Sequence, residues 1–446
     1  MGFTYLAFSL TGRHSRQSEN GIPPNHRKPQ FAMTAWRLID KLNDTVTSFF
    51  TLNSPLVFDI LDVPHGKISK KTTGGGFVSI SLREKFFGCI CGAHIGSSMG
   101  AVVEGWTHQR IQETHGTVDK LMEYEHYRNG WVRAAGTTED GIERQKLMIT
   151  AILDKGGRVN AEDVRASWVK NMNPKAPGNI SEPFEGELLA MAKTKIPAAD
   201  IGRYCDYAGL NSFARACHPI GLINAGNIRG AIDDIMEVGQ LYQTSYSRGL
   251  KWACVTGVAI AAATMPGATV DSVLQAVFDN CNERAFVPGR ENWYADYAGV
   301  NVADEIQTGL KLTENCKDFR EMREVFDDVY NGKGMPYSMS FANEVVTKGI
   351  CIFKMTGGDL KQAIIAGVNL GRDTDCITAV AAGISGALTG ASSLPPEWIA
   401  QVDYATSIHP FTNSKRTLRE TSDGLYDTFK SQLMSLKQYS EAMDID

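Results

Sequence analysis

The sequence has no large excess of charge of either sign. Among its 446 residues, 45 are Lys or Arg and 50 are Asp or Glu, which gives a net charge of -5 at pH 7. Basic residues do not cluster around the aromatic residues, whereas nucleic-acid-binding surfaces concentrate basic groups on one face. We therefore expect no nucleic-acid partner.

Long apolar runs and alternating apolar runs are also missing. The apolar stretch from Trp252 to Met265 covers only about 14 residues, and a helix that spans a bilayer needs about 20. Apolar residues between positions 84 and 405 recur at helical spacing, and no convincing stretch alternates with the period of a strand. The sequence therefore predicts an all-α protein with one large compact helical domain over residues 81–440 and no membrane span.

Cysteine shows no pattern of pairing. The nine cysteines are an odd number scattered through helical patterns, which favours a reducing compartment over a disulfide framework. Cys89 and Cys91 are too close on a helix to face each other and have no second pair, so no zinc site is expected. We expect a cytoplasmic protein, with a mitochondrial location as the alternative.

The first 80 residues differ in composition from the rest of the chain. Residues 11–30 are polar and basic, with prolines at 23, 24 and 29, a composition typical of disorder or a linker. Residues 34–62 have the spacing of an amphipathic helix and a loop, and glycines 74–76 resemble a hinge. Residues 1–80 are therefore predicted to be a partly disordered extension with one helix.

Acidic residues, by contrast, are placed at helix boundaries. Residues 371–375 interrupt the apolar helical spacing of 360–368, which resumes at 377–388, so Asp373 and Asp375 are predicted to lie at a junction inside the core. Two buried carboxylates require cations or a shared proton, and oxygen ligands suit Mg²⁺ or Mn²⁺. In the alternative interpretation, one aspartate caps the following helix and the other is exposed.

A second acidic junction precedes a helical pattern that starts near residue 142. Thr138, Glu139 and Asp140 offer a hydroxyl group and two carboxylates, which are hard oxygen ligands. Asp140 followed by Glu143 also matches a capping box, and local sequence alone favours that interpretation. The first junction gives the metal interpretation more weight, because two half-sites could share a pair of ions.

Glycines recur at every fourth position of another helical stretch, at 88, 92, 96 and 100. They form one ridge of a helix, and each costs about 1 kcal/mol relative to alanine, so close backbone packing must compensate. Glu104 follows this ridge directly. Its carboxylate is a candidate acid, base or ligand, and a solvated residue at a helix end is the alternative.

Three aromatic residues and two separate arginines precede the second acidic junction. Tyr124, Tyr127 and Trp131 lie near Arg128 and Arg133, and such groups could stack on and pair with a nucleotide or another aromatic leaving group. A lid packed on the core is the alternative.

Together these segments resemble the ADP-ribosylglycohydrolase family, which includes the dinitrogenase reductase-activating glycohydrolases. The family's Gly-Asp-x-x-Gly-x-x-x-Glu is similar to residues 96–104, its Thr-Asp-Asp-Thr to 138–141, and its Gly-Gly-Asp-Thr-Asp-Thr to 371–376. The order, spacing and context of the motifs match over roughly residues 82 to 405. The resemblance implies the all-α fold of this family.

A fourth family element agrees in part. The family's Asn-Gly-x-x-Met-Arg followed by Pro-x-Gly resembles residues 211–221. Counted back from Pro219, however, Arg215 sits one place early.

The chain departs from the family pattern at several positions. Ser97 and Glu139 stand where Asp is usual, Gly141 and Cys376 where Thr is usual, Arg372 where Gly is usual, and Thr244-Ser245 where relatives often carry Thr-His. Most carboxylate ligands are retained. We therefore expect a diverged substrate, since a decayed enzyme would have lost the acids themselves.

The resemblance implies a divalent-metal-dependent glycoside hydrolase that cleaves the C1″ N- or O-glycosidic bond of a ribosyl group. It implies two Mg²⁺ sites, with Mn²⁺ as an alternative ion, and a ribosylated small molecule or an ADP-ribosylated acceptor as substrate. Hydrolysis of a smaller nucleoside-like N-glycoside metabolite and a non-catalytic, crystallin-like binding protein are the alternatives.

The resemblance also assigns site residues. It implies catalysis by Glu104 and Asp375, substrate binding by Asn211, Arg215, Gly371 and Ser98, and metal binding by Thr138, Glu139, Asp140, Asp373 and Asp375. Glu104 is the first choice for orienting or deprotonating the attacking water, and Asp375 is its competitor.

Overall fold

The computed structural model of the chain describes residues 80–125, 130–173, 183–204, 210–244, 248–281, 301–330 and 338–444. They belong to the unit Phe77–Asp446, one of two units into which the chain divides. The predicted extension, 1–80, lies outside the described residues except for Ile80.

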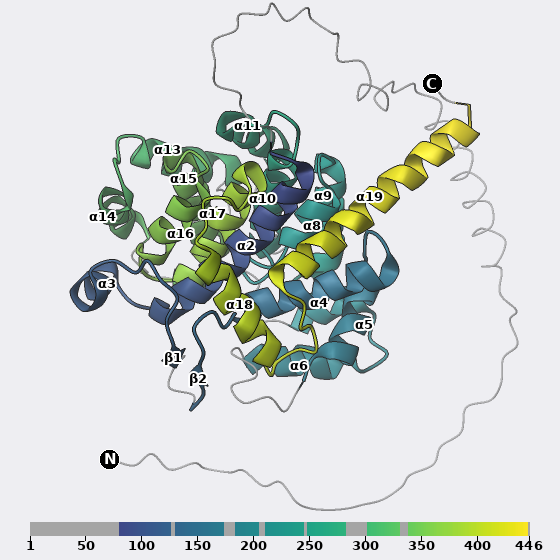
Figure 1. The fold of residues 1–446 in the computed structure, drawn as a ribbon, viewed down its shortest axis with the longest axis horizontal. Helices are drawn as coiled ribbons and strands as arrows, with labels where there is room; N and C mark the ends of the chain where they lie inside the picture. Colours follow the sequence, from purple (N-terminus) through teal and green to yellow (C-terminus); the bar gives the residue numbers. More distant parts are fainter. Residues whose placement is uncertain are drawn as a thin grey trace, which may run out of the picture. The chain divides into compact units, whose positions relative to one another are not determined.

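The described part of the chain folds almost entirely into helices (Figure 1). The α-helices are α2 (Leu82–Gly100), α3 (His108–His115), α4 (Asp140–Lys155), α5 (Ala161–Asn171), α6 (Pro183–Ala192), α7 (Ala198–Ile201), α8 (His218–Ile223), α9 (Ile228–Val238), α10 (Arg248–Ala263), α11 (Val270–Asn280), α13 (Val302–Thr313), α14 (Phe319–Val329), α15 (Ala342–Met355), α16 (Leu360–Val368), α17 (Thr374–Thr389), α18 (Pro396–Ile408) and α19 (Leu418–Ala442). The short 3-10 helices are η1 (Ala101–Val103), η2 (Gly202–Tyr204), η3 (Gly239–Leu241) and η4 (Ser338–Ser340). The predicted all-α fold is confirmed.

A small hairpin accompanies these helices. Strands β1 (Tyr124–Glu125) and β2 (Val132–Arg133) pair antiparallel, with Tyr124 opposite Arg133. The hairpin follows α3 in the chain and directly precedes the second acidic junction.

Helix α2 is the central element, and it packs along α17 (Figure 1). The predicted glycine ridge makes this contact, because a Cβ atom added at Gly92 would lie 2.2 Å from the carbonyl oxygen of Ala382. At the end of the ridge, a Cβ atom at Gly100 would lie 2.6 Å from Cα of Asp375. The ridge therefore brings the end of α2 against the start of α17, where the predicted acid pair lies.

Other helices bury most of the remaining surface of α2. Helices α4, α8, α16, α18 and α19 all contact it. The segment Leu82–Val103 is long and apolar enough to cross a membrane, but 94% of its apolar window is buried inside the domain. Packing against neighbouring helices therefore accounts for its apolar character. The short apolar stretch that begins at Trp252 forms the larger part of α10 and is buried through Ala263.

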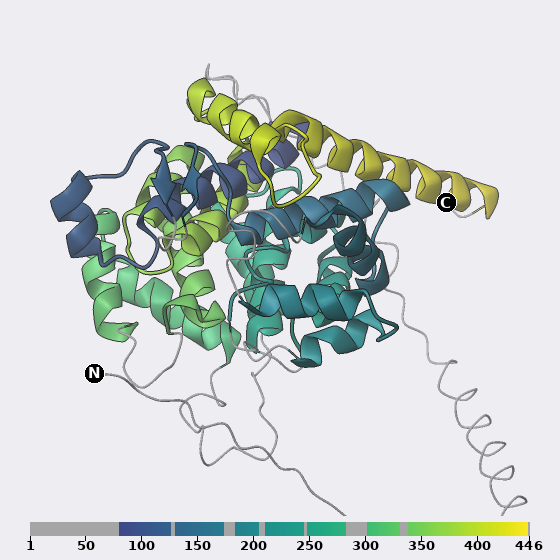
Figure 2. The ribbon, with the colours of Figure 1, turned by 90° about the horizontal axis from the view of Figure 1, so that it is seen from below.

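The last helix, α19, has two halves of different character. Its first half contacts α2, α4 and α8 and buries Leu425 and Phe429. Its second half extends past the neighbouring helices, as Figure 2 shows, and carries exposed apolar side chains such as Leu433 and Leu436.

Candidate active site

The first acidic junction is formed as the sequence predicted. Helix α16 ends at Val368 and α17 begins at Thr374. Asp373 occupies the N-cap position of α17, but its side chain makes no capping hydrogen bond. Asp375 follows inside the first turn, and both side chains are buried, with 1% of each residue exposed. The alternative of one capping and one exposed aspartate is therefore wrong.

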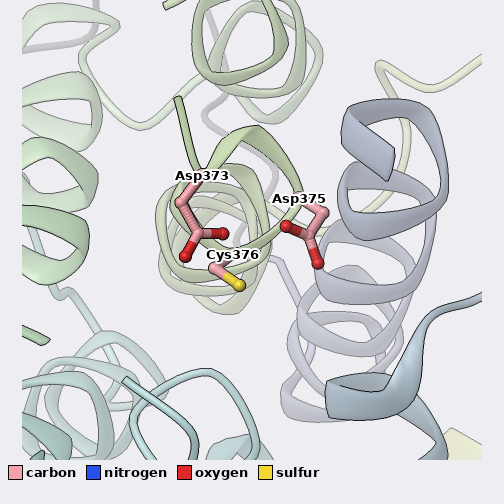
Figure 3. A group of neighbouring side chains, drawn as sticks. All are labelled: Asp373, Asp375 and Cys376. Carbon is pink, nitrogen blue, oxygen red and sulfur yellow. The ribbon is translucent and has the colours of Figure 1, made fainter. Parts of the chain in front are cut away.

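Three side chains converge at this junction (Figure 3). One ligand atom from each of Asp373, Asp375 and Cys376 lies within 4.8 Å of the other two. The Oδ1 atoms of both aspartates are buried and have no hydrogen-bond partner in the described part of the chain. Burial, and then the charge of Asp373, raises the pKa of Asp375 well above its ordinary value. A cation at this position would relieve both effects.

Asn211 holds one of the two aspartates in place. Its Nδ2 atom donates to Oδ2 of Asp373 and to the carbonyl oxygen of Ser340, each over 3.0 Å. An isolated antiparallel bridge between Leu210 and Phe341 fixes the backbone beside it. The predicted substrate-binding residue Asn211 therefore orients an acid in this structure.

Arg215 connects the two acidic junctions. Its Nη1 atom donates to Oδ2 of Asp375 over 3.2 Å and to Sγ of Cys376 over 3.1 Å. Its Nη2 atom donates to Oδ2 of Asp140 over 2.5 Å. The same Asp140 oxygen lies 3.2 Å from Nη2 of Arg144. Asp140 thus contacts two buried guanidinium groups, and one of them extends to the other junction.

The second junction does not form the predicted capping box. Helix α4 begins at Asp140, and the side chain of its N-cap residue, Glu139, makes no capping hydrogen bond. Glu143 instead accepts a hydrogen bond from the Thr138 hydroxyl over 2.6 Å and pairs with Nζ of Lys146 over 2.7 Å. The capping interpretation of Asp140 and Glu143 is therefore wrong, because side chains, and not the backbone N–H groups of the helix start, bind these carboxylates.

Glu143 lies in a fully buried polar network. Thr412 donates to its Oε2 atom over 3.0 Å, and Nδ1 of His409 lies 3.7 Å from the same atom. Burial alone would raise the pKa of Glu143, but the charges of His409 and Lys146 and the hydrogen bonds to the carboxylate lower it to about 2. Glu143 is therefore an ionised structural acid behind the site.

The hairpin binds the remaining acid of the second junction. Nε of Arg133 lies 3.2 Å from Oε1 of Glu139, and the Tyr124 hydroxyl donates to the same oxygen. The guanidinium of Arg133 also lies 4.3 Å from the ring centroid of Trp131. These contacts favour the packed lid over a substrate-stacking role for Tyr124 and Arg133. The other two candidates, residues 127 and 128, lie outside the described residues.

The five predicted metal ligands thus have different surroundings. Asp373 and Asp375 come together, and Asp140 is linked to Asp375 through Arg215. The side chains of Thr138 and Glu139 make their described contacts with other partners, on α4 and the hairpin.

Glu104 lies beside the acid pair. It caps η1 and is half-buried. After burial, its charge is the largest influence that raises the pKa of Asp373, so the two carboxylates are near each other. Gly105 donates from its backbone to the carbonyl oxygen of Arg372 over 2.8 Å, and Arg372 donates to that of Trp106 over 2.7 Å. These hydrogen bonds join the Glu104 loop to the Asp373 loop.

Arg372 replaces the usual family glycine and keeps a left-handed conformation, with φ 68°. Its Nε and Nη2 atoms bind the two carboxylate oxygens of Glu344 over 2.6 Å and 2.9 Å. Nζ of Lys348 also lies 2.7 Å from Glu344. Because left-handed backbone is unfavourable for residues other than glycine, this bidentate pair stabilises the loop that carries Asp373.

The two other predicted substrate-binding residues contact backbone. The Ser98 hydroxyl donates to the carbonyl oxygens of His94 and Gly136 over 2.9 Å and 3.0 Å, so it ties α2 to the loop before α4. Gly371 has φ 82°, and a Cβ atom there would lie 2.7 Å from the backbone nitrogen of His108. Both residues position the loops around the site.

Sequence reasoning missed the buried cations of the site. Arg144 and Lys146 follow the acids Asp140 and Glu143 at helical spacing, and that spacing was the available signal. Glu344 had the same signal toward Lys348, four residues later, but none toward Arg372, which is 28 positions away.

Comparison with known proteins agrees with the motif pattern. The model of the ADP-ribosylglycohydrolase family matches residues 79–432. The uncharacterized protein YegU of Escherichia coli (strain K12) is 21% identical over 350 residues, which cover 75% of this chain and 99% of that protein. A solved structure described as an ADP-ribosylglycohydrolase-related protein complex superposes with a TM-score of 0.54 at 15% identity, over 78% of this chain and 99% of the other. Since the family model covers most of the sequence, the chain belongs to the ADP-ribosylglycohydrolase family.

Proposed function

We propose that this protein is a divalent-metal-dependent glycohydrolase that cleaves the C1″ N- or O-glycosidic bond of a ribosylated substrate. The pair Asp373 and Asp375 carries the proposal, since each is buried and keeps one carboxylate oxygen without a hydrogen-bond partner among the described residues. Such oxygens are costly to bury, and a cation satisfies both at once. Family membership supports the reaction class.

One divalent ion fits the residues of this junction. The two Oδ1 atoms are hard donors that suit Mg²⁺ or Mn²⁺. Cys376 is a poorer donor, because burial raises the pKa of its thiol well above the ordinary value and keeps it protonated. When bound, such an ion would supply Lewis-acid stabilisation of ribose oxygens and of a bound water.

Glu104 is the best-placed base. It is half-buried, whereas Asp375 is 1% exposed and accepts a hydrogen bond from Arg215. A base must reach the water that attacks the anomeric carbon, and Glu104 has the better access. Asn211 donates a hydrogen bond to Asp373 and so fixes the position of its carboxylate. The carboxylates of Asp373 and Glu104 would then lie near the positive charge that develops on the ribosyl ring during cleavage.

The leaving group defines two substrate classes. The family description points to an ADP-ribosyl group on a protein or small acceptor. A smaller nucleoside-like N-glycoside would use the same ribosyl chemistry without the pyrophosphate. We propose the first and treat the second as an outcome of the test.

Mass spectrometry of reaction products tests the proposal. The full chain is incubated with Mg²⁺ or Mn²⁺ and a panel of ADP-ribosylated peptides, nucleosides and ribosides. We expect release of ADP-ribose that chelation by EDTA abolishes. Release of ribose from nucleosides alone would select the second class, and no product with either ion would contradict the proposal.

Two variants control that experiment. Asp373→Asn removes a charge from the acid pair and should abolish product release. Asp427→Asn removes a charge from an exposed ion pair with Arg83 and should leave product release unchanged.

We also propose a cytoplasmic location, with mitochondria as the alternative. The cysteines in the described part of the chain are free thiols, and reducing compartments preserve that state. Fractionation of cells tests the location, and recovery in the mitochondrial matrix would select the alternative.

A further inference from the structure

We infer that the guanidinium group of Arg215 takes the place of one of the two divalent ions that the family pattern implies, so that this centre binds a single ion at Asp373 and Asp375. The inference rests on the proposed metal binding. In addition, it assigns the second positive charge of the centre to an arginine side chain of the protein.

The contacts of Arg215 are those expected of a bridging cation. Its Nη2 atom binds Oδ2 of Asp140 on α4 over 2.5 Å, and its Nη1 atom binds Oδ2 of Asp375 on α17 over 3.2 Å. Its side chain is 8% exposed, and the two acids are 6% and 1% exposed. A buried cation between carboxylates of two helices thus performs the neutralising task of a shared ion.

Both lost family threonines lie against this arginine. Cys376, at one threonine position, accepts a hydrogen bond from Nη1 of Arg215 over 3.1 Å. Gly141, at the other, has no side chain, and a Cβ atom there would lie 2.7 Å from Cδ and 2.8 Å from Nε of Arg215. A threonine at 141 would therefore collide with the arginine. The guanidinium group therefore occupies the space that two threonine side chains of the family pattern would otherwise border.

The register of the preceding motif explains how the arginine reaches this space. The backbone of Arg215 donates to the carbonyl oxygen of Asn211, four residues earlier, over 3.2 Å, so this segment makes a helical turn. A shift of one residue in such a turn rotates a side chain by about 100°. Arg215 stands one place early, where the family pattern has methionine, and so points into the centre.

The distribution of charge identifies the junction that keeps an ion. Asp140 contacts two guanidinium groups, those of Arg144 and Arg215. A divalent ion placed there would face two positive groups at short range and would be repelled. Among the described contacts, Arg215 is the only one of these two arginines that reaches the other junction, through Asp375. Asp373 contacts the neutral amide of Asn211 and has an unpartnered Oδ1 atom in the described structure.

The number of bound ions tests the inference without using activity. Calorimetry and elemental analysis with Mn²⁺ should give one ion per wild-type chain. Arg215→Met, which restores the family residue at this position, should give two. Paramagnetic resonance should change from the spectrum of an isolated Mn²⁺ to that of a coupled pair, since paired ions lie about 3.5 to 4 Å apart.

Two further variants separate charge from folding. Arg215→Lys keeps a positive charge and should keep one ion. Arg323→Met removes an arginine of similar burial on α14, with 8% of the whole residue exposed against 7% of the whole residue for Arg215, and should also keep one ion. If Arg215→Met folds only when Mn²⁺ is present, its melting temperature should increase more with Mn²⁺ concentration than the melting temperature of the wild type does.

Two ions in the wild type, or one ion in folded Arg215→Met, would overturn the inference and leave the proposed glycohydrolase intact. A change from one ion to two in a protein that cleaves no glycoside would support the inference and remove the proposed function. The two ideas can therefore fail separately.

Discussion

The side chain of Thr374 donates a hydrogen bond to the carbonyl oxygen of Gly100 over 2.8 Å. Thr374 lies between the two aspartates of α17, and Gly100 ends the ridge of α2. Glu104 follows four residues later, and the Gly105 backbone binds that of Arg372. These contacts fix the position of the candidate base Glu104 relative to Asp373 and Asp375. Changes that disturb the packing of the glycine ridge should therefore also affect the site.

Gly92→Ala should destabilise the fold. Alanine gains about 1 kcal/mol of helix propensity, but its Cβ atom would lie 2.2 Å from the backbone oxygen of Ala382. Overpacking against rigid backbone costs about 3 kcal/mol, so the loss prevails. Denaturant unfolding measures it. Gly424→Ala in α19 is the control, because its Cβ atom meets only the mobile end of Leu153 at 3.1 Å; equal stability of the two variants would contradict close packing at the ridge.

Asp373→Asn should weaken metal binding by more than about 100-fold, since changes to residues that only support metal ligands already cost 10- to 100-fold. The asparagine keeps the size of the side chain and removes its charge. Calorimetry with Mn²⁺ measures the affinity, with Asp427→Asn as the surface control. Unchanged affinity in Asp373→Asn would remove this residue from the metal site.

Glu104→Gln should lower turnover by about 100-fold or more, the range of a lost general base. Because Glu104 is half-buried at the end of η1 and outside the apolar core, the melting temperature should stay nearly unchanged. Glu84→Gln, on the first turn of α2, is the control and should keep its turnover. Near-native turnover in Glu104→Gln would transfer the role of base to Asp375.

Cys376→Thr should tighten Mg²⁺ binding by about fivefold, equivalent to about 1 kcal/mol for one hydrogen-bond-sized contact. The Cys376 sulfur faces both aspartates, and an oxygen there suits Mg²⁺ better than sulfur does. Titrations with Mg²⁺ and Mn²⁺ should show a smaller preference for Mn²⁺ in the variant. Cys351→Thr alters a buried cysteine on α15 and should leave affinity unchanged. A less stable Cys376→Thr protein with unchanged affinity would show that residue 376 serves packing only.

Glu143→Gln should reduce stability at neutral pH and have a smaller effect in acid. The pKa of Glu143 is about 2 in the fold against an ordinary 4.5, so its ionised form stabilises the fold above pH 4.5. That contribution, about 3 kcal/mol, is lost as the pH falls from 4.5 toward 2. Urea unfolding at pH 7 and at pH 3.5 measures the difference in the free energy of unfolding between the wild type and Glu143→Gln, which should be smaller at pH 3.5. Glu397→Gln, on the exposed side of α18, should follow the wild type at both values, and a gap independent of pH would contradict the role of the Glu143 charge.

The helical fold, the glycine ridge and the acidic junction of α17 could all be predicted from the amino-acid sequence. These features are local, because helical spacing of apolar residues and of glycines is encoded within about 20 neighbouring positions. The motifs also determined the family, since their order along the chain survives divergence at single positions.

The pairing of distant charges in the site depends on how the helices pack. Arg215 binds Asp140 and Asp375, which are 75 and 160 positions away in the sequence. The local pattern favoured Asp140 and Glu143 as helix caps, but the packed structure adds Arg215 to Asp140, and Thr412 and His409 to Glu143. The protonation state of a carboxylate in the core depends on its burial and on the nearest opposite charge. For residues far apart in the sequence, the packing of the helices determines which opposite charge is nearest.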